Sequence, residues 1–132
     1  MDRHQPGAYV MTTHSLKYRN ALAYVTKDGS TIRELMHPAQ QDVQRQSLAE
    51  AIVPVGETTL LHLHPNTEEL YHITAGEGLM TLGEEQFTVT PGDTVCIRPG
   101  TRHCIQNTGN DELKILCCCV PAYSHEDTVL LG

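Results

Sequence analysis

The sequence is short of positive charge. Nine lysines and arginines stand against sixteen aspartates and glutamates, which gives a formal net charge of −7 over 132 residues. Such a surface repels a phosphate backbone, so nucleic acid is not expected as a partner. A long apolar run is also lacking, so no membrane-spanning segment is expected. The length suits a single domain and is too short for two hydrophobic cores.

Several familiar motifs are missing as well. The N-terminal residues contain no apolar stretch of the kind found in secretory signals, so a cytoplasmic location with reduced thiols is expected. The five cysteines form no CxxC pair, and three of them are consecutive, Cys117, Cys118 and Cys119. Neither a GxSxG sequence nor a phosphate-binding glycine loop occurs. These absences argue against nucleophilic-triad hydrolysis and nucleotide binding.

No persuasive helical period is present, and short alternating segments take its place. Turn residues recur about every 8–12 positions, which is typical of an all-β sandwich or barrel. We expect an N-terminal arm over residues 1–20 and one domain over residues 21–132. One helical turn is allowed within 38–51. Strands are expected within 21–35, 47–55, 58–64, 68–74, 78–83, 86–90, 94–98, 103–107 and 113–120.

The first strand pair has a particularly clear turn signal. Asp28-Gly29 lies between two segments rich in apolar residues, and this dipeptide is among the strongest short hairpin signals. We therefore predict a hairpin centred on these two residues.

Histidines cluster in the middle of the chain. His62 and His64 are two apart on a predicted strand, so both side chains point to one face. Glu69 begins the next strand after a turn and would lie beside them, and His103 offers a third imidazole. Paired histidines are often only polar residues on a solvated face. Together with a carboxylate, however, they form a donor set suited to a divalent transition metal.

Two motifs surround these residues. The first runs Gly56, five residues, His62, one, His64, four, Glu69, six, Gly76. It resembles the first cupin motif at every defining position.

The second motif runs from Gly92 through Gly100 and His103 to Asn107 and resembles the second cupin motif. It departs at one position, where Arg98 replaces the usual proline and Pro99 follows. The chain is therefore identified as similar to small single-domain cupins of the RmlC-like jelly-roll superfamily.

This resemblance implies a double-stranded β-helix, the jelly-roll cupin barrel. It implies that His62, His64, Glu69 and His103 bind one divalent metal, which is Fe, Mn, Ni, Zn or Cu in different members. It also implies a homodimer. Cupins include dioxygenases, decarboxylases, isomerases, lyases, storage proteins and sugar-sensing domains, so the fold does not name the reaction.

Alternate residues of a strand point to opposite faces of the sheet, which predicts the direction of several further side chains. Tyr71 shares the parity of Glu69 and is a candidate catalytic residue, with a purely structural wall position as the alternative. His72 has the opposite parity and should face outward. Asn107 has the parity of His103, and a structural role is preferred for it.

Three features leave their alternatives open. The inward face of Cys117, Cys118 and Cys119 is not determined, although buried cysteine is usually a small apolar residue. The facing of Arg98 and Arg102 is equally open. The tail YSHEDT, with His125, would cover the barrel mouth or a partner, and a solvated tail is preferred.

Three functional hypotheses follow. The first is a metal-dependent enzyme acting on a small organic molecule, of dioxygenase, decarboxylase, isomerase or lyase type. The second is a non-catalytic module that binds or senses a sugar or metabolite. A structural or storage role ranks last, because it does not need an intact set of metal ligands.

Overall fold

The computed structural model describes residues 14–132, so most of the expected N-terminal arm lies outside the described residues. Among these residues the regular structure consists of one short 3-10 helix, η1 (Tyr18–Asn20), and eleven strands joined by turns and loops. The strands are β1 (Ala23–Val25), β2 (Thr31–Met36), β3 (Ser47–Val53), β4 (His62–Leu63), β5 (Glu68–Ala75), β6 (Gly78–Leu82), β7 (Glu85–Val89), β8 (Thr94–Ile97), β9 (His103–Asn107), β10 (Leu113–Val120) and β11 (Val129–Leu130).

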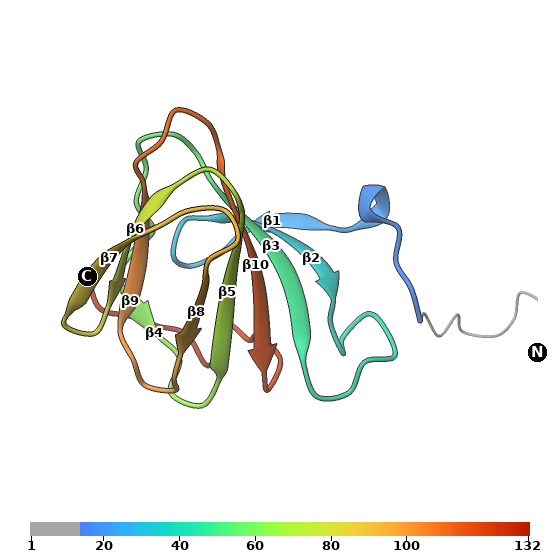
Figure 1. Cartoon of the computed structure of the whole chain (residues 1–132). Coiled ribbons are helices and arrows are strands. Elements are labelled where there is room, and N and C mark those ends of the chain that lie inside the picture. Colours follow the sequence, from blue (N-terminus) through green and yellow to red (C-terminus); the bar gives the residue numbers. More distant parts are fainter. Residues whose placement is uncertain (1–13) are drawn as a thin grey trace, which may run out of the picture.

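These strands form two antiparallel sheets packed face to face (Figure 1). The six-stranded sheet has the order β1-β2-β3-β10-β5-β8, and the five-stranded sheet has the order β11-β4-β9-β6-β7. Each sheet is hydrogen-bonded separately, so the jelly roll is a pair of sheets and not a continuously closed barrel. The predicted all-β cupin architecture is confirmed.

Period-two alternation decides which side chains lie between the sheets. On β5, Glu69, Tyr71 and Ile73 are buried while the residues between them are exposed. The long strand β10 alternates in the same way over its eight residues. Burying alternate side chains of two facing sheets is how an antiparallel sandwich removes apolar surface from water.

The interior changes character along its length. At one end the fully buried side chains are apolar, and they include Ile73, Met80, Ile105, Leu113 and Ile115. At the other end the same strands place histidine, glutamate, tyrosine and cysteine inward. The apolar end supplies most of the hydrophobic core, to which Tyr71 and Cys117 of the polar end also belong.

The predicted hairpin joins β1 to β2. Gly29 has φ +91°, a left-handed backbone conformation that residues other than glycine rarely adopt. Its amide donates to the Thr26 carbonyl at 3.0 Å. A further bond from the Leu60 amide to the Asp28 carbonyl, 2.8 Å, fixes the hairpin tip beside the segment that leads into β4. The turn prediction is confirmed, and the tip lies against the strand of His62.

Other local expectations are corrected. Segment 58–64 forms a regular strand only at His62–Leu63, and β11 was not predicted. The single turn allowed within 38–51 is present at its start, where the Gln40 and Gln41 amides donate to the His37 carbonyl at 2.9 Å, and a polar loop then leads into β3. No helix in the described part of the chain is long and apolar enough to cross a membrane.

The C-terminal tail also differs from expectation. We expected a solvated tail, but Thr128 is buried and Lys27 Nζ donates to the carbonyls of His125 and Thr128 at 2.8 and 3.2 Å. The Asp127 carboxylate accepts from the Thr67 amide at 3.0 Å. The tail is therefore packed across the polar end of the interior, although the His125 side chain itself is exposed.

Candidate metal centre

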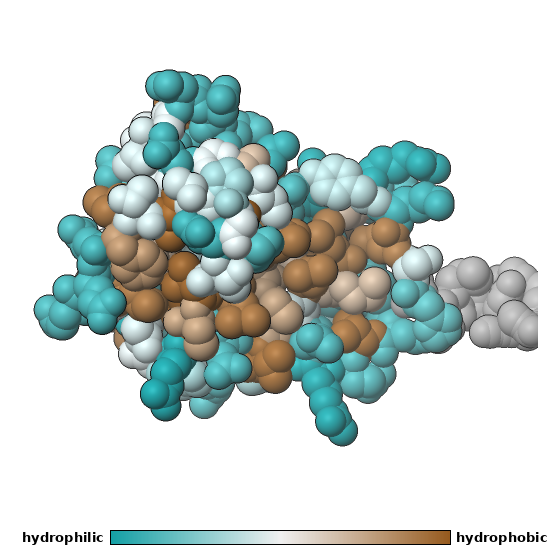
Figure 2. Space-filling view, in the orientation of Figure 1, coloured by the Kyte–Doolittle hydropathy of each residue, from teal (hydrophilic) through white to brown (hydrophobic). Residues whose placement is uncertain are grey.

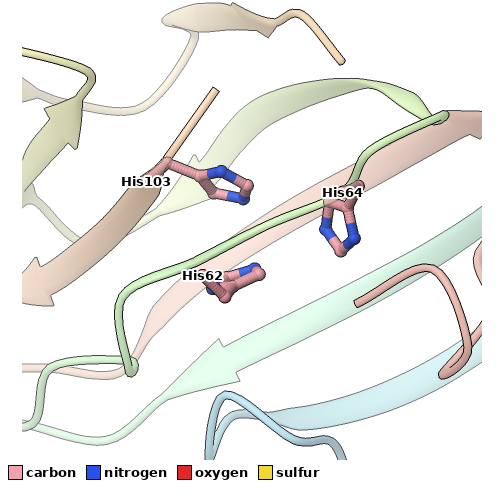
Figure 3. Close-up of side chains that lie close together, drawn as sticks. All are labelled: His62, His64 and His103. Atoms are coloured by element: carbon pink, nitrogen blue, oxygen red, sulfur yellow. The ribbon is translucent and has the colours of Figure 1, made fainter. Parts of the chain in front are cut away.

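Three histidines meet at the polar end, and each is buried (Figure 3). His62 on β4 lies directly opposite His103 on β9, and their ring centroids are 4.2 Å apart. His64 follows two residues after His62 and shares its face. The three rings bring one nitrogen each to within 4.8 Å of the others, which is close enough for a single metal ion.

Two of these rings are oriented by the backbone just upstream of them. His62 Nδ1 lies 2.8 Å from the Leu60 carbonyl oxygen, and His103 Nδ1 lies 2.9 Å from the Thr101 carbonyl oxygen. A carbonyl oxygen only accepts, so each Nδ1 must carry the hydrogen. In the neutral ring the lone pair is then on Nε2, the nitrogen that faces the cluster.

The third ring is oriented by the tail. His64 Nδ1 lies 3.3 Å from both the Asp127 carbonyl oxygen and the Thr128 hydroxyl. This arrangement again leaves Nε2 to face the other two histidines. The tail therefore contributes to the site through His64.

Glu69 closes the cluster on one side. Its Oε1 lies 3.3 Å from His64 Nε2 and 3.6 Å from His103 Nε2, while its Oε2 accepts a weak hydrogen bond from Cys119 Sγ at 3.4 Å. Neither Glu69 Oε1 nor His103 Nε2 has a hydrogen-bond partner, although both are buried. A buried carboxylate oxygen and an imidazole nitrogen without partners are well placed to share a cation, so the donor set fits a metal ion.

The electrostatics agree with this geometry. Burial acts to raise the pKa of Glu69, but the imidazoles of His103 and His64 outweigh it and lower that pKa to about 2. Burial acts to lower the pKa of His64, yet Glu69 reverses this and raises it. For His62, burial and the neighbouring His103 both lower the pKa. The metal-free cluster thus already attracts positive charge at Glu69 and His64.

A cavity of about 40 Å³ lies beside the cluster and has both polar and apolar walls. Tyr71 contributes to its lining, with its ring 5.9 Å from that of His103. Burial, followed by the charge of Glu69, raises the pKa of the Tyr71 phenol well above its ordinary value. The phenol therefore stays protonated and is available as a hydrogen-bond donor.

The structure resolves the facing of the cysteines. Cys117 and Cys119 are buried and line the cavity, while Cys118 points to the outer face of the sheet. Burial raises the pKa of both inward thiols, and the nearby Glu69 adds to this effect. Protonated, buried thiols behave as small apolar residues, which favours the structural interpretation.

The remaining predicted positions have simple outcomes. His72 is exposed, as expected, and its Nδ1 lies 2.7 Å from the Thr94 hydroxyl. The buried Asn107 amide donates to the Val53 and Asp111 carbonyls at 2.9 and 2.8 Å, so it holds a loop.

Neither arginine that follows β8 lines the cavity. Arg98 is exposed, and Arg102 pairs with Glu84 at 2.9 Å. Their side chains are therefore not placed to bind a ligand of the cluster.

One cavity residue was missed at the sequence level. Asp28 is buried at the hairpin tip, and its Oδ2 lies 3.7 Å from His62 Nε2. The Asp-Gly dipeptide was fully explained as a turn signal, so nothing in the sequence pointed to a second role. Asp28 thus places a second carboxylate beside the histidine cluster, on the side of His62.

Comparison with known proteins agrees with the fold. The cupin domain family matches residues 49–119, and the chain belongs to this family. The uncharacterized protein MJ1618 of Methanocaldococcus jannaschii is 58% identical over 115 residues, which cover 87% of this chain and 92% of that protein. An oxalate-binding protein of Thermotoga maritima is 32% identical over 84 residues, which cover 64% of this chain and 65% of that protein.

A solved structure extends the agreement over the whole fold. Streptomyces PAC13, a nucleoside dehydratase solved with uridine, superposes with a TM-score of 0.76 and covers 92% of each chain. Its sequence identity is 15%, so the likeness concerns the fold alone.

The histidine cluster gives a first prediction. The protein purified from cells should contain about one transition metal per chain, and His62→Ala or His103→Ala should reduce this to near zero, because each removes a converging Nε2. The matched control is His72→Ala, which removes an exposed histidine from a neighbouring strand. This variant should keep its full metal content. Elemental analysis measures the content. Full metal content in a His62→Ala/His64→Ala double variant would contradict the assignment.

The raised pKa of His64 gives a second prediction. In the metal-free protein His64 takes up its proton above its ordinary pKa of about 6.5, and a metal must displace that proton. Metal affinity should therefore be at its maximum above the raised pKa of His64. Below that pKa it should fall by up to about tenfold per pH unit. Glu69 stays ionised throughout this range. Chelator competition at a series of pH values measures the effect. A metal affinity that does not change between about pH 6 and 8 would contradict the prediction.

Proposed function

We propose that this chain is a metal-dependent enzyme acting on a small organic molecule. In this proposal His62, His64, Glu69 and His103 hold one divalent transition metal. The observation that carries it is the convergence of three buried histidines and Glu69 beside a cavity, with Glu69 Oε1 and His103 Nε2 unpartnered. Reactions of dioxygenase, decarboxylase, isomerase or lyase type all fit this donor set.

The placement of the ligands supports a reactive centre over a structural one. The four side chains come from β4, β5, β9 and the segment after β4, and the cavity adjoins them. A metal bound there would keep a position for a ligand oxygen and supply Lewis-acid or oxygen chemistry. The apolar end of the interior already provides a core, so folding does not depend on the metal as it does in a zinc finger.

Tyr71 is the candidate for assisting a bound ligand. It lines the cavity next to His103, and burial keeps its phenol protonated. A neutral phenol at this position can donate a hydrogen bond to a ligand oxygen but cannot act as a base near neutral pH.

A binding function without turnover is the second candidate. It is favoured by the likeness to an oxalate-binding protein, which is 32% identical over 84 residues. A turnover screen with the native metal, using carbonyl, diol and carboxylate metabolites with and without O₂, distinguishes the two candidates.

A homodimer is part of the proposal and has a suitable surface. On the outer face of the six-stranded sheet, Leu48, Cys118, Leu70 and Cys96 are register neighbours on β3, β10, β5 and β8. Figure 2 shows apolar side chains gathered on this face. An exposed apolar band of this kind favours a protein interface.

An open metal centre predicts a spectroscopic response. Small anions or chelating diols added to the Co(II)-loaded protein should change its visible spectrum, because they reach the ion from the cavity. Removing the metal should leave a folded apo-protein by circular dichroism. A spectrum that never responds to a small ligand, or an unfolded apo-protein, would mean that the site is structural.

The apolar band predicts the oligomeric state. Sedimentation velocity should give about twice the chain mass of 14.6 kDa. Leu70→Glu places a charge in the band and should shift the protein toward monomer. Thr88→Glu, at an exposed position on β7 of the other sheet, should not. A wild-type monomer would refute the dimer without affecting the metal site.

A further inference from the structure

Asp28 is held in one orientation by three hydrogen bonds to a single oxygen. Its Oδ1 accepts from the Thr26 hydroxyl at 2.6 Å, the Ser30 amide at 2.9 Å and the Ser30 hydroxyl at 2.7 Å. The residue is only 8% exposed. A side chain fixed in this way presents its other oxygen in a defined direction, which is how a binding group is preorganised.

The other oxygen is directed into the site. Asp28 Oδ2 lies 3.7 Å from His62 Nε2, and no hydrogen bond to it is found within residues 14–132. His62 donates its Nδ1 hydrogen to Leu60, so in the neutral ring it has none left for Asp28. Asp28 lines the same cavity as Tyr71, His62 and His64. The cavity therefore contains a strong acceptor that no protein donor satisfies and that a ligand hydroxyl can reach in place of water.

The charges around the cavity indicate which ligand that is. Asp28, Glu69 and Glu34 line it, and no lysine or arginine does so among the described residues. Lys27, the neighbour of Asp28, is engaged with the tail carbonyls instead. A divalent ion together with these three carboxylates has a net charge of −1, so a dianion would add further unbalanced negative charge. A neutral ligand with a hydroxyl group satisfies Asp28 without that cost.

The size of the cavity points the same way. A volume of about 40 Å³ is enough for roughly three water-sized groups, since one water needs about 10–15 Å³. A ligand with two adjacent oxygens fits this space, one oxygen toward the histidine cluster and the other toward Asp28.

We propose that Asp28 determines specificity by accepting a hydrogen bond from a hydroxyl group of the ligand. The substrate class is then a small neutral α-hydroxycarbonyl compound or vicinal diol, and not a dicarboxylate. This inference rests on the proposed metal centre and adds to it the chemistry of the ligand. It also separates this chain from its oxalate-binding relative.

The test compares two probes of similar size, hydroxyacetone and oxalate, by titrating Co(II)-loaded protein and following its visible spectrum. The wild type should bind hydroxyacetone more tightly than oxalate. Asp28→Asn should weaken hydroxyacetone binding about tenfold, through loss of a charge-assisted hydrogen bond, and should strengthen oxalate binding. This reversal of preference is a readout that a merely structural role would not produce.

Asp93→Asn is the matched control. Asp93 also holds a turn through its carboxylate, which accepts from the Thr90 amide at 2.8 Å, but it is exposed and away from the cavity. It removes the same charge and should change neither affinity. If Asp28→Asn does not fold, Ser30→Ala serves as the second variant. It keeps the Asp28 carboxylate and removes the hydrogen bond from the Ser30 hydroxyl that helps to orient it. It should weaken hydroxyacetone binding by less than tenfold without affecting cobalt content.

The outcomes separate this inference from the metal proposal. Three results would overturn the role of Asp28 while the metal centre stands. They are equal hydroxyacetone affinities in the wild type and Asp28→Asn, a wild-type preference for oxalate, and unchanged hydroxyacetone binding in Ser30→Ala. Loss of cobalt in Asp28→Asn would make Asp28 a ligand and also overturn it. If the wild type binds no cobalt through His62, the proposed function fails and the inference fails with it.

Discussion

The site depends on one constraint, the meeting of three buried imidazoles and a buried carboxylate, in which Glu69 Oε1 and His103 Nε2 lack a hydrogen-bond partner. Backbone carbonyls hold the Nδ1 hydrogens of His62 and His103, so the free nitrogen of His103 faces Glu69 and that of His62 faces Asp28. A buried acceptor without a partner costs about 1–3 kcal/mol, and more for a charged group. Only a cation removes this cost for all of the atoms at once. The two sheets therefore hold in place an arrangement that is satisfied by binding.

Much of the fold and part of the site were predictable because strands have a period of two. Alternation alone placed Glu69 and Tyr71 inside and His72 outside. The turn at Asp28-Gly29 was equally readable, since a left-handed glycine is what a tight hairpin needs. In each case the information is local, and a few neighbouring residues determine the outcome.

The rest depended on contacts between residues far apart in the chain. The pairing of His62 with His103 joins β4 to β9, and only the family resemblance suggested it. The tail reaches back more than sixty residues to orient His64, which no local pattern encodes. Asp28 was missed for another reason. Its turn role explained the residue completely, and a carboxylate has two oxygens that can serve different purposes.

The division of the interior into an apolar end and a polar end has an evolutionary consequence. Ile73 and Ile115 are fully buried and do not line the cavity, although Tyr71 and Cys117, two residues away on the same strands, do. Substitutions at distant, independent sites have nearly additive effects on stability. The cavity wall can therefore diverge while the core tolerates the change, and a new ligand preference need not require a new scaffold. The hairpin tip that carries Asp28 lies outside residues 49–119, the part that matches the family, and is a natural place for such divergence.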